Sequence, residues 1–489
     1  MKVLALLLSL SLLVISHEFG HFLFARLFKT RVRRFYLFFN WKFSILKAKK
    51  FGGKWHFLFF NGKTPDSWDE KNLAPEDQDN TLWGIGWIPL GGYCDIAGMI
   101  DETKGKDEME SEPQQWEYRM KKPWQRLCII SGGVLVNFIS ALLIYTCIFA
   151  HWGKDELPLR NAALGYDYHE LLLAEGFQNG DIIYAIDGKE MTDIVKTQHA
   201  LLLDNPKIVT VLRQSTLSDT VVYGDAEAGE PVNMAINTRD TQMLVDIALS
   251  YNLLEKIDPR DTNLLFTIRA PFVVKDFAPG SRAKRAGLQA GDSVVGVNDK
   301  RITSFSDVSP ELANHKSEDV VLWFYRDGTL DSAVVNVDDA GKIGVYLMDP
   351  LKVFNSIHND YNFFQAIPVG ISYGWNQLVT YARSLKILFT PDGYKGLGGF
   401  GTLGGLFPEH WDWYSFWNIT AFLAVILAFM NIIPIPGLDG GHILFTLWEM
   451  ITRRKPSEKF LEIAQTIGMV LLFGLLILAN GNDILKLFK

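Results

Sequence analysis

Four long apolar runs alternate with polar stretches along the chain. The first covers residues 3–28, which is longer than the roughly 20 residues that span a bilayer, and only a few titratable residues interrupt it. The second, 127–150, contains no charge, and the other two cover about 416–435 and 463–479. This pattern predicts four membrane-spanning helices. A cleaved signal peptide is the alternative for the first run, but no small-residue cleavage site follows it.

Basic residues mark the loops that we expect in the cytoplasm. About ten Lys and Arg residues lie from Arg26 to Lys54, and three more occupy 453–455. Because positively charged loops remain cytoplasmic, four spans place both termini and the segment 152–412 on the far side of the membrane. A further apolar stretch, 363–389, carries two basic residues and several polar ones, so we expect an amphipathic helix at the interface.

Composition narrows the class of protein. Among 489 residues, 48% are hydrophobic and 21% charged, which excludes a disordered chain and indicates both membrane and aqueous parts. The net charge of -7 provides no basic field for nucleic acid, so we expect no nucleic-acid partner. Three cysteines are too few for a disulfide framework or a cysteine-based metal site, so other residues must supply any metal ligands.

A repeat occupies the polar middle of the chain. Residues 175–191 and 286–302 share a Gly-Asp turn, an alternating apolar strand and a second tight turn, at an offset of 111 from Gly180 to Gly291. The repeat predicts two related β-rich domains, which we place at 155–262 and 265–348. The second closely resembles a PDZ domain of the membrane-protease type, and the first is a looser match.

PDZ grooves bind an extended peptide as an added strand and capture a terminal carboxylate, so the resemblance implies a filter for substrates or partners. A steric plug that binds nothing is the alternative, and the residues do not separate the two.

His17, Glu18 and His21 form an H-E-x-x-H pattern within the first apolar run. Positions i and i+4 of a helix share one face, so both imidazoles can bind one metal ion with Glu18 beside it as a general base. A charged residue at the centre of a membrane helix costs about 3 kcal/mol, so these residues need partners. The pattern predicts two zinc ligands and a catalytic base.

A catalytic zinc site normally has three protein ligands and one position for water. The third apolar run leads into Asn431, two helix-breaking prolines at Pro434 and Pro436, and then Asp439. We expect Asp439 to be the third ligand. The alternatives are that Asp439 only caps the following helix, or that His442 binds the metal in its place.

Together these motifs resemble the site-2 protease family of intramembrane zinc metalloproteases (peptidase family M50), specifically its PDZ-containing bacterial RseP type. The motifs are H-E-F-G-H, two central PDZ-type domains, and N-x-x-P-x-P-x-L-D-G-G from Asn431, in the family's order. Residues 88–93 resemble the family's membrane-associated hairpin, and 132–137 its glycine and asparagine motif in the second span. Three departures, at Asp95, Gly133 and Phe400, touch no proposed ligand. The insert at about 51–81 has no assigned counterpart.

The resulting fold class is a multi-pass α-helical membrane protein with two tandem β-rich PDZ-like domains inserted between spans two and three. We expect the following order: a first span (1–28), a cytoplasmic segment (29–126) with a membrane-associated β-hairpin (84–99), a second span (127–150), the two β-rich domains, an interfacial segment (350–412), a third span (416–442) and a fourth (460–480).

The resemblance implies zinc-dependent hydrolysis of peptide bonds within transmembrane segments of single-span membrane proteins, such as pre-trimmed anti-sigma factors and remnant signal peptides. A helical substrate must unwind before attack, and its freed backbone groups need partners. The hairpin can supply a strand edge, and Asn137 and Asn431 can donate side-chain amides, although hydrogen bonding between helices is an equal alternative for both. The remaining expected substrate contacts are Gly91, Gly92, Tyr93, Pro434 and Pro436.

Two other functions are compatible with parts of the pattern. A membrane scaffold with a structural metal would normally have a closed site of four ligands, and a zinc transporter has no use for Glu18 or for tandem PDZ-like domains. The expected location is a bacterial inner membrane, with the active site toward the cytoplasm and the PDZ-like domains in the periplasm.

Overall fold

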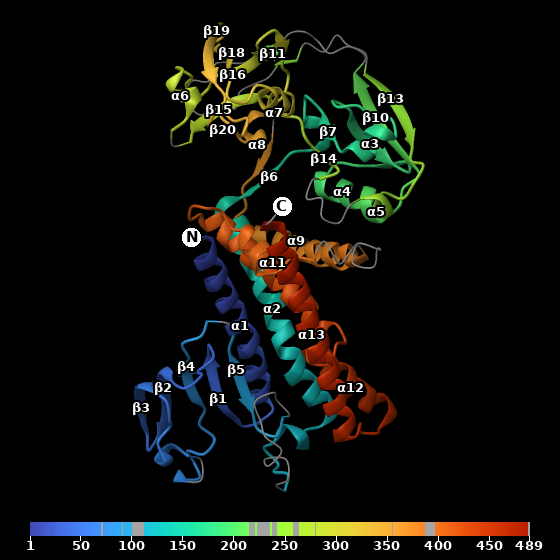
Figure 1. The fold of residues 1–489 in the computed structure, drawn as a ribbon. Helices are drawn as coiled ribbons and strands as arrows, with labels where there is room; N and C mark the ends of the chain where they lie inside the picture. The colour runs from blue at the N-terminus through green and yellow to red at the C-terminus, as the bar shows by residue number, and fades with distance from the viewer. Residues whose placement is uncertain are drawn as a thin grey trace. The chain divides into compact units, whose positions relative to one another are not determined.

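The computed structural model describes residues 1–69, 72–89, 91–99, 112–214, 221–222, 235–236, 242–257, 264–278, 280–354, 356–386 and 397–487. These residues form two compact units (Figure 1). The first contains the N-terminal 153 residues, 360–385 and the C-terminal part of the chain. The second contains the described residues of 154–359 and Lys386.

The first unit contains the membrane helices and one sheet. Its elements are α1 (Lys2–Leu27), β1 (Val32–Leu37), β2 (Ser44–Phe51), β3 (Lys54–Asn61), β4 (Leu82–Ile85), β5 (Tyr93–Ile96), α2 (Pro123–Trp152), α9 (Phe363–Ser384), α10 (Phe400–Gly405), α11 (Trp413–Ile432), α12 (Asp439–Thr452) and α13 (Glu458–Leu487). Among the described residues, α1, α2, α11 and α13 are long and apolar enough to cross a membrane, which confirms the four predicted spans.

The third span ends where a proline-containing segment interrupts the helix. The carboxylate of Asp412 caps the start of α11 by accepting the Ser415 N–H at 2.7 Å. The helix stops at Ile432 because Pro434 disfavours helical geometry at the residue before it and lacks an N–H. The range 416–442 assigned to one span therefore covers two helices, and the second, α12, begins at Asp439.

A five-stranded sheet packs against α1, with strand order β3-β2-β4-β1-β5. Strand β4 pairs with β1 in parallel and β5 pairs with β1 antiparallel, so β1 separates them. The expected hairpin at 84–99 is therefore wrong: the segment crosses the end of β1 instead of turning back on itself. A bridge between Phe39 and Ile88 marks this crossing, and Leu90 lies outside the described residues.

Helix α9 packs across α2 and is not among the four spanning candidates. A Cβ added at Gly370 would lie 2.5 Å from Thr146 Oγ1, and one added at Gly374 would lie 2.5 Å from Leu142 Cδ2. These two glycines therefore permit the close approach of the helices. The interfacial location of α9 stays a prediction, and residues 387–389 of the predicted segment lie outside the described residues.

The second unit is mainly β-structure. Its elements are β6 (Lys154–Glu156), β7 (Tyr166–Tyr168), α3 (Glu170–Ala174), β8 (Ile182–Ile186), β9 (Lys189–Glu190), α4 (Ile194–Leu203), β10 (Ile208–Gln214), β11 (Val221–Val222), β12 (Ala235–Ile236), β13 (Gln242–Ala248), α5 (Leu253–Lys256), β14 (Phe266–Ile268), β15 (Phe272–Phe277), α6 (Arg282–Arg285), β16 (Ser293–Val297), β17 (Lys300–Arg301), α7 (Phe305–Asn314), β18 (Asp319–Arg326), β19 (Thr329–Asn336), β20 (Val345–Leu347), α8 (Pro350–Val353) and β21 (Ile357–Asn359).

The two Gly-Asp turns of the repeat are built alike. Asp181 accepts hydrogen bonds from Arg213 at 2.9 and 2.7 Å, and Asp292 accepts them from Arg326 at 2.8 and 2.7 Å. In each turn the backbone N–H of the glutamine three residues before the Asp also donates to its carboxylate. The same side chains thus stabilise equivalent turns in two sheets, of order β13-β10-β8-β9 and β19-β18-β16-β15-β20.

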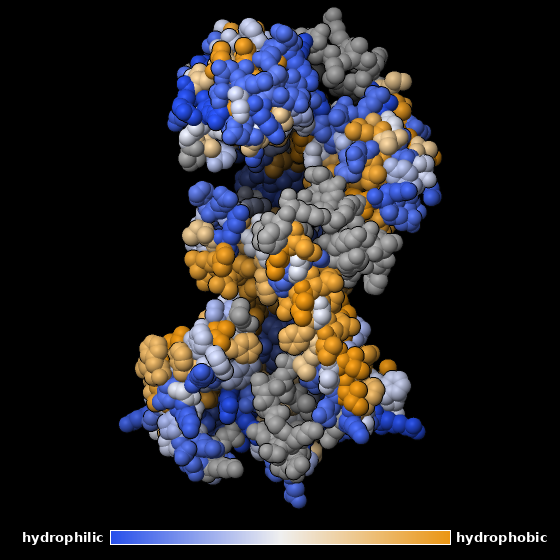
Figure 2. All heavy atoms as spheres, in the orientation of Figure 1, coloured by the Kyte–Doolittle hydropathy of each residue, from blue (hydrophilic) through white to orange (hydrophobic). Residues whose placement is uncertain are grey.

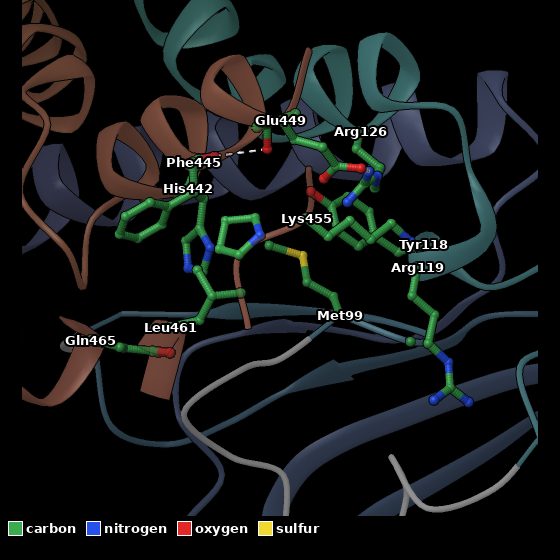
Figure 3. Close-up of a pocket in the computed structure, with 13 residues that line it drawn as sticks. Met99, Tyr118, Arg119, Arg126, His442, Phe445, Glu449, Lys455, Leu461 and Gln465 are labelled. Atoms are coloured by element: carbon green, nitrogen blue, oxygen red, sulfur yellow. Dashed lines mark hydrogen bonds and ion pairs between the residues drawn. The ribbon is translucent and has the colours of Figure 1, made fainter. Parts of the chain in front are cut away.

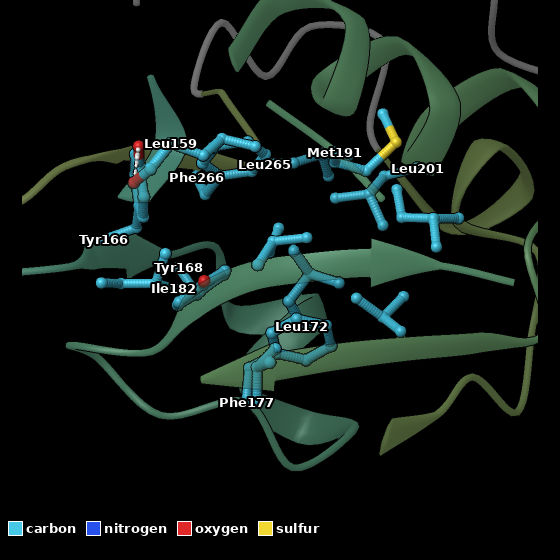
Figure 4. Close-up of a cluster of buried hydrophobic side chains, with 14 of the residues drawn as sticks. Leu159, Tyr166, Tyr168, Leu172, Phe177, Ile182, Met191, Leu201, Leu265 and Phe266 are labelled. Atoms are coloured by element: carbon cyan, nitrogen blue, oxygen red, sulfur yellow. Dashed lines mark hydrogen bonds between the residues drawn. The ribbon is translucent and has the colours of Figure 1, made fainter. Parts of the chain in front are cut away.

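The first β-rich domain extends further along the chain than expected. Strand β14 pairs with β7, and Leu265 and Phe266 lie in the buried cluster of this domain (Figure 4). Phe354 belongs to the same cluster, although the sequence placed it in an interfacial segment. The expected boundary between 262 and 265 is therefore wrong, because β14 forms a two-stranded sheet with β7 of the first domain, and no local pattern records that pairing.

Candidate metal centre

Helix α1 brings the imidazoles of His17 and His21 together on one face. Their Nε2 atoms are 3.2 Å apart, and their ring centroids lie 4.7 Å apart in an edge arrangement. The i and i+4 spacing on a continuous helix produces this juxtaposition. Glu18, the next residue after His17, is half-buried on the same helix turn. The three residues thus occupy a single turn.

Asp439 approaches the two histidines from the start of α12. Its Oδ2 lies 3.2 Å from Nε2 of His17 and 3.3 Å from Nε2 of His21. A Cβ at Gly440 would lie only 2.0 Å from the carbonyl oxygen of Ile433, so this turn requires glycine. The proline break therefore redirects the chain so that a carboxylate meets two imidazoles from a helix more than 400 residues earlier.

Glycines of α2 leave space for the two imidazoles of α1. A Cβ at Gly133 would lie 2.6 Å from both His17 Cε1 and His21 Nε2. One at Gly20 would lie 2.2 Å from the carbonyl oxygen of Gly132. Glycine at these positions allows α1 and α2 to touch through their backbones. Any side chain at position 133 would occupy the space of the imidazoles, so the expectation that the departure at Gly133 touches no proposed ligand is wrong.

The outward nitrogens of both imidazoles contact α2. Nδ1 of His21 lies 3.0 Å from the carbonyl oxygen of Ile129, and Nδ1 of His17 lies 3.4 Å from Nδ2 of Asn137. Both Nε2 atoms therefore remain directed toward Asp439. Sequence reasoning missed Ile129, because a backbone carbonyl within an apolar helix has no signature in the sequence.

The donor atoms fit a metal ion. One atom from each of His17, His21 and Asp439 lies within 4.8 Å of the others. Oδ2 of Asp439 is buried and accepts no hydrogen bond among the described residues, although such a carboxylate oxygen needs a donor or a cation. Two imidazoles and one carboxylate are the donor set of an open catalytic zinc site.

A cavity of about 170 Å³ lies beside α12 (Figure 3). His442 lines it, together with Tyr118 and the ion pair between Arg126 and Glu449, whose atoms are 2.6 Å apart. Burial raises the pKa of the Tyr118 phenol, which keeps it neutral as a hydrogen-bond donor. His442 is not part of the three-residue cluster, so the structure places it along the cavity wall.

The other predicted site residues lie in different surroundings. Asn431 is buried near the end of α11, and Pro434 and Pro436 form the break before α12. A Cβ at Gly92 would lie 3.4 Å from Val14 Cγ1, which places the entry to β5 beside α1. Tyr93 instead stacks on a sheet tyrosine, with its hydroxyl 3.3 Å from Asn40 Oδ1. Gly91 packs toward Phe39.

A model of peptidase family M50 matches residues 5–62 and 70–475. The chain belongs to this family. It is 25% identical to "Protease RseP" of Yersinia pestis over 99% of this chain and 98% of that protein. It is 24% identical to a "Putative zinc metalloprotease" of Vibrio cholerae, over 99% and 98%. It is 26% identical to a protein of the same name in Borreliella burgdorferi, over the full length of both.

Membership confirms the resemblance to the site-2 protease family. The chain is a membrane-associated zinc metalloprotease, because the family model covers nearly its whole length and the relatives are named as such enzymes. Zinc, expected from the motif, is the metal of this family.

Proposed function

We propose that the protein hydrolyses peptide bonds in the transmembrane segments of single-span membrane proteins. His17, His21 and Asp439 hold the zinc ion, and Glu18 is the catalytic base. The observation that carries this proposal is the convergence of three donor atoms within 4.8 Å beside Glu18, on helices that can span a membrane. Hydrolysis at this position places the reaction inside the bilayer.

Glu18 takes a proton from the attacking water and passes it to the leaving amine. When bound, zinc polarises the scissile carbonyl and lowers the pKa of its water to about 7. The contact of His21 with the Ile129 carbonyl holds its ring so that Nε2 faces the metal position. The cavity along α12, whose lining includes Arg126, His442 and Glu449, is the proposed approach for water.

Strand β5 supplies the edge that an unwound substrate needs. Among the described strands it stands last in the order of its sheet and pairs with β1, and it packs beside α1. A substrate that leaves its helix exposes backbone groups, and an added strand on β5 satisfies them. The role first expected of a hairpin therefore passes to a single edge strand.

The two β-rich domains are PDZ-like and screen substrates, either by binding an extended peptide or by excluding bulky ones. The matched Asp and Arg pairs of the two domains support their common origin as a tandem repeat. The excess of basic residues from Arg26 to Lys54 supports a bacterial cytoplasmic membrane with this loop inside and the β-rich domains outside.

The test uses purified full-length protein and a tagged single-span peptide in detergent or nanodiscs. Glu18→Gln keeps the metal and removes the base, so a specific cut made by the wild type disappears while zinc content remains unchanged. Glu462→Gln, the same chemical change at an exposed position of α13, serves as the matched control and cuts normally. Equal cutting by the Glu18 variant overturns the mechanism.

A further inference from the structure

The insert in the cytoplasmic segment adds an aromatic strand to the sheet. Strand β3 forms a ribbon with β2, and its side chains Trp55, Phe57 and Phe59 are 52%, 55% and 66% exposed. They alternate along the strand and therefore share one face. Soluble surfaces rarely expose so many large apolar groups together, so this face has a partner.

The opposite face of the ribbon is covered by the insert itself. Nζ of Lys47 donates to the Gly62 carbonyl at 3.2 Å, and Nζ of Lys49 donates to the Trp68 carbonyl at 3.1 Å. Trp68 is buried there, with its ring 5.7 Å from that of Phe51. The chain thus closes one face with its own loop and leaves the aromatic face open.

More exposed aromatic side chains continue this face at the end of the ribbon. Trp41 and Phe43 are exposed, and the ring of Phe43 stacks on that of Trp87 at 5.6 Å. In Figure 2, hydrophobic atoms gather over the upper left of the sheet, while hydrophilic atoms lie along its lower edge. The exposed aromatic residues therefore lie on a different part of the sheet from its hydrophilic residues.

We propose that this aromatic face, Trp55, Phe57 and Phe59 with the adjoining end of the ribbon, rests in the interface of the phospholipid bilayer. Strand β1 begins five residues after the spanning helix α1 ends, so the sheet starts at the membrane surface. Trp is a typical interfacial residue, and three exposed lysines of this region, Lys42, Lys50 and Lys54, complement anionic headgroups, whereas Lys47 and Lys49 are buried on the opposite face. Lipid is therefore the occupant that fits both the rings and the charge.

The test attaches an environment-sensitive fluorophore to single cysteines in full-length protein whose native cysteines are replaced. In nanodiscs, the label at Phe57→Cys shifts to the blue and is quenched at least twofold by doxyl-labelled lipid. The label at Ser67→Cys, on the covering loop of the same insert, is quenched by aqueous iodide instead. Iodide quenching at position 57 overturns the proposal. Protection from both quenchers also overturns it and indicates a protein partner or a second copy.

An independent observation concerns Asn137, and this second inference rests on the proposed zinc ligands. Asn137 is fully buried, its Nδ2 lies 3.4 Å from His17 Nδ1, and its Oδ1 has no hydrogen-bond partner among the described residues. Nε2 of His17 faces Asp439, so Nδ1 of a neutral ring that binds metal through Nε2 carries the hydrogen. As placed, one donor therefore faces another donor.

Turning the amide by half a rotation removes this contact between two donors, since the two ends of an Asn amide are nearly equal in shape. Oδ1 then accepts the Nδ1–H of His17, and no buried oxygen is left unpaired. We infer that Asn137 is a positioning residue, which fixes the tautomer and direction of His17. It acts through this ligand and is not a contact for substrate.

Zinc affinity, measured by competition with a chelator, tests this role. Asn137→Leu weakens zinc binding by about 10–100-fold, the usual effect of losing a hydrogen bond behind a ligand. Asn137→Asp, which keeps the acceptor, binds zinc at least as tightly as the wild type. Thr420→Val, at a buried polar residue of α11 outside the cluster, leaves the affinity unchanged.

Unchanged zinc affinity in Asn137→Leu, with a raised KM for substrate, overturns the inference in favour of a substrate contact. This result is distinct from failure of the proposed function, in which the wild type itself binds no stoichiometric zinc.

Discussion

Buried carboxylates have different partners in the candidate metal centre and in the two β-rich domains. Asp181 and Asp292 have side chains that are only 1% exposed, and each accepts two hydrogen bonds from an arginine on a neighbouring strand. Asp439 is also largely buried, yet it faces only two imidazole nitrogens, and its Oδ2 accepts no hydrogen bond among the described residues. The same chemical group is satisfied in one region and left incomplete in the other.

This difference distinguishes carboxylates that stabilise the fold from a carboxylate that is available for function. A buried ion pair with complete hydrogen bonding maintains a turn, whereas an incomplete buried carboxylate indicates that a further cation belongs there. Local rules fail where function requires an unsatisfied group. The comparison predicts that removing Asp439 affects chemistry and that removing the arginines affects folding.

The largest expected effect comes from Asp439→Asn. Loss of the proposed third ligand removes zinc and several kcal/mol of transition-state stabilisation, so activity falls by about 1,000-fold or more. In the presence of a chelator, the thermal stability of this variant equals or exceeds that of the wild type, because an incomplete buried charge is gone. Zinc analysis, a cleavage assay and melting curves check this. A variant that retained stoichiometric zinc would contradict the assignment of the ligand.

Arg326→Met has the next largest effect, and it acts on stability. The variant leaves Asp292 buried without its partner, which costs about 3–5 kcal/mol. Hydrogen exchange in full-length protein then shows faster exchange in β16 and β18, while zinc content stays at the wild-type level. Arg213→Met produces the matching change in β8 and β10 of the first domain. If either variant lost zinc while its strands kept their protection, the division between structural and functional charge would be wrong.

A smaller effect depends on pH and concerns Asp307 of the second β-rich domain, whose partner Arg269 also pairs with Asp167 of the first. Burial alone would raise the pKa of Asp307, but hydrogen bonds from Thr303 and the charge of Arg269 hold it below its usual range. A depressed pKa stabilises the fold above the unfolded value of about 3.9, and this stabilisation is lost as pH falls through the folded value.

Wild-type protein therefore loses stability between about pH 5 and pH 3 more steeply than Asp307→Asn does. Melting curves at both pH values measure the difference. Equal slopes for the two proteins would exclude a contribution from Asp307.

The smallest effect is expected for Arg160→Met. The ion pair of Arg160 with Glu190 has a separation of 2.5 Å, but both side chains are substantially exposed. Water and salt screen such pairs, so the loss of stability is below about 1 kcal/mol. Denaturant unfolding measures it beside Arg326→Met. A loss as large as that of the buried arginine would remove burial as the reason for the contrast.

Local patterns in the sequence determined much of this protein. Run length and apolarity predicted the four spanning helices, because a bilayer requires a fixed length of continuous apolar helix. The spacing of His17 and His21 predicted that their imidazoles share one face, and the repeat predicted two related β-rich domains. Asp439 was chosen because the apolar runs contain few carboxylates, and in the structure it lies beside His17 and His21.

Tertiary structure decided the features that depend on distant pairing. The position of β1 between β4 and β5, and the completion of the first domain by β14, follow from strand partners that no local periodicity specifies. The contact of Asn137 with His17 depends on how closely two helices approach, and glycines at their crossing set that distance. Sequence therefore determined which groups are present and on which helix face. Only packing decided which of those groups meet, because side-chain contacts depend on the arrangement of elements far apart in the chain.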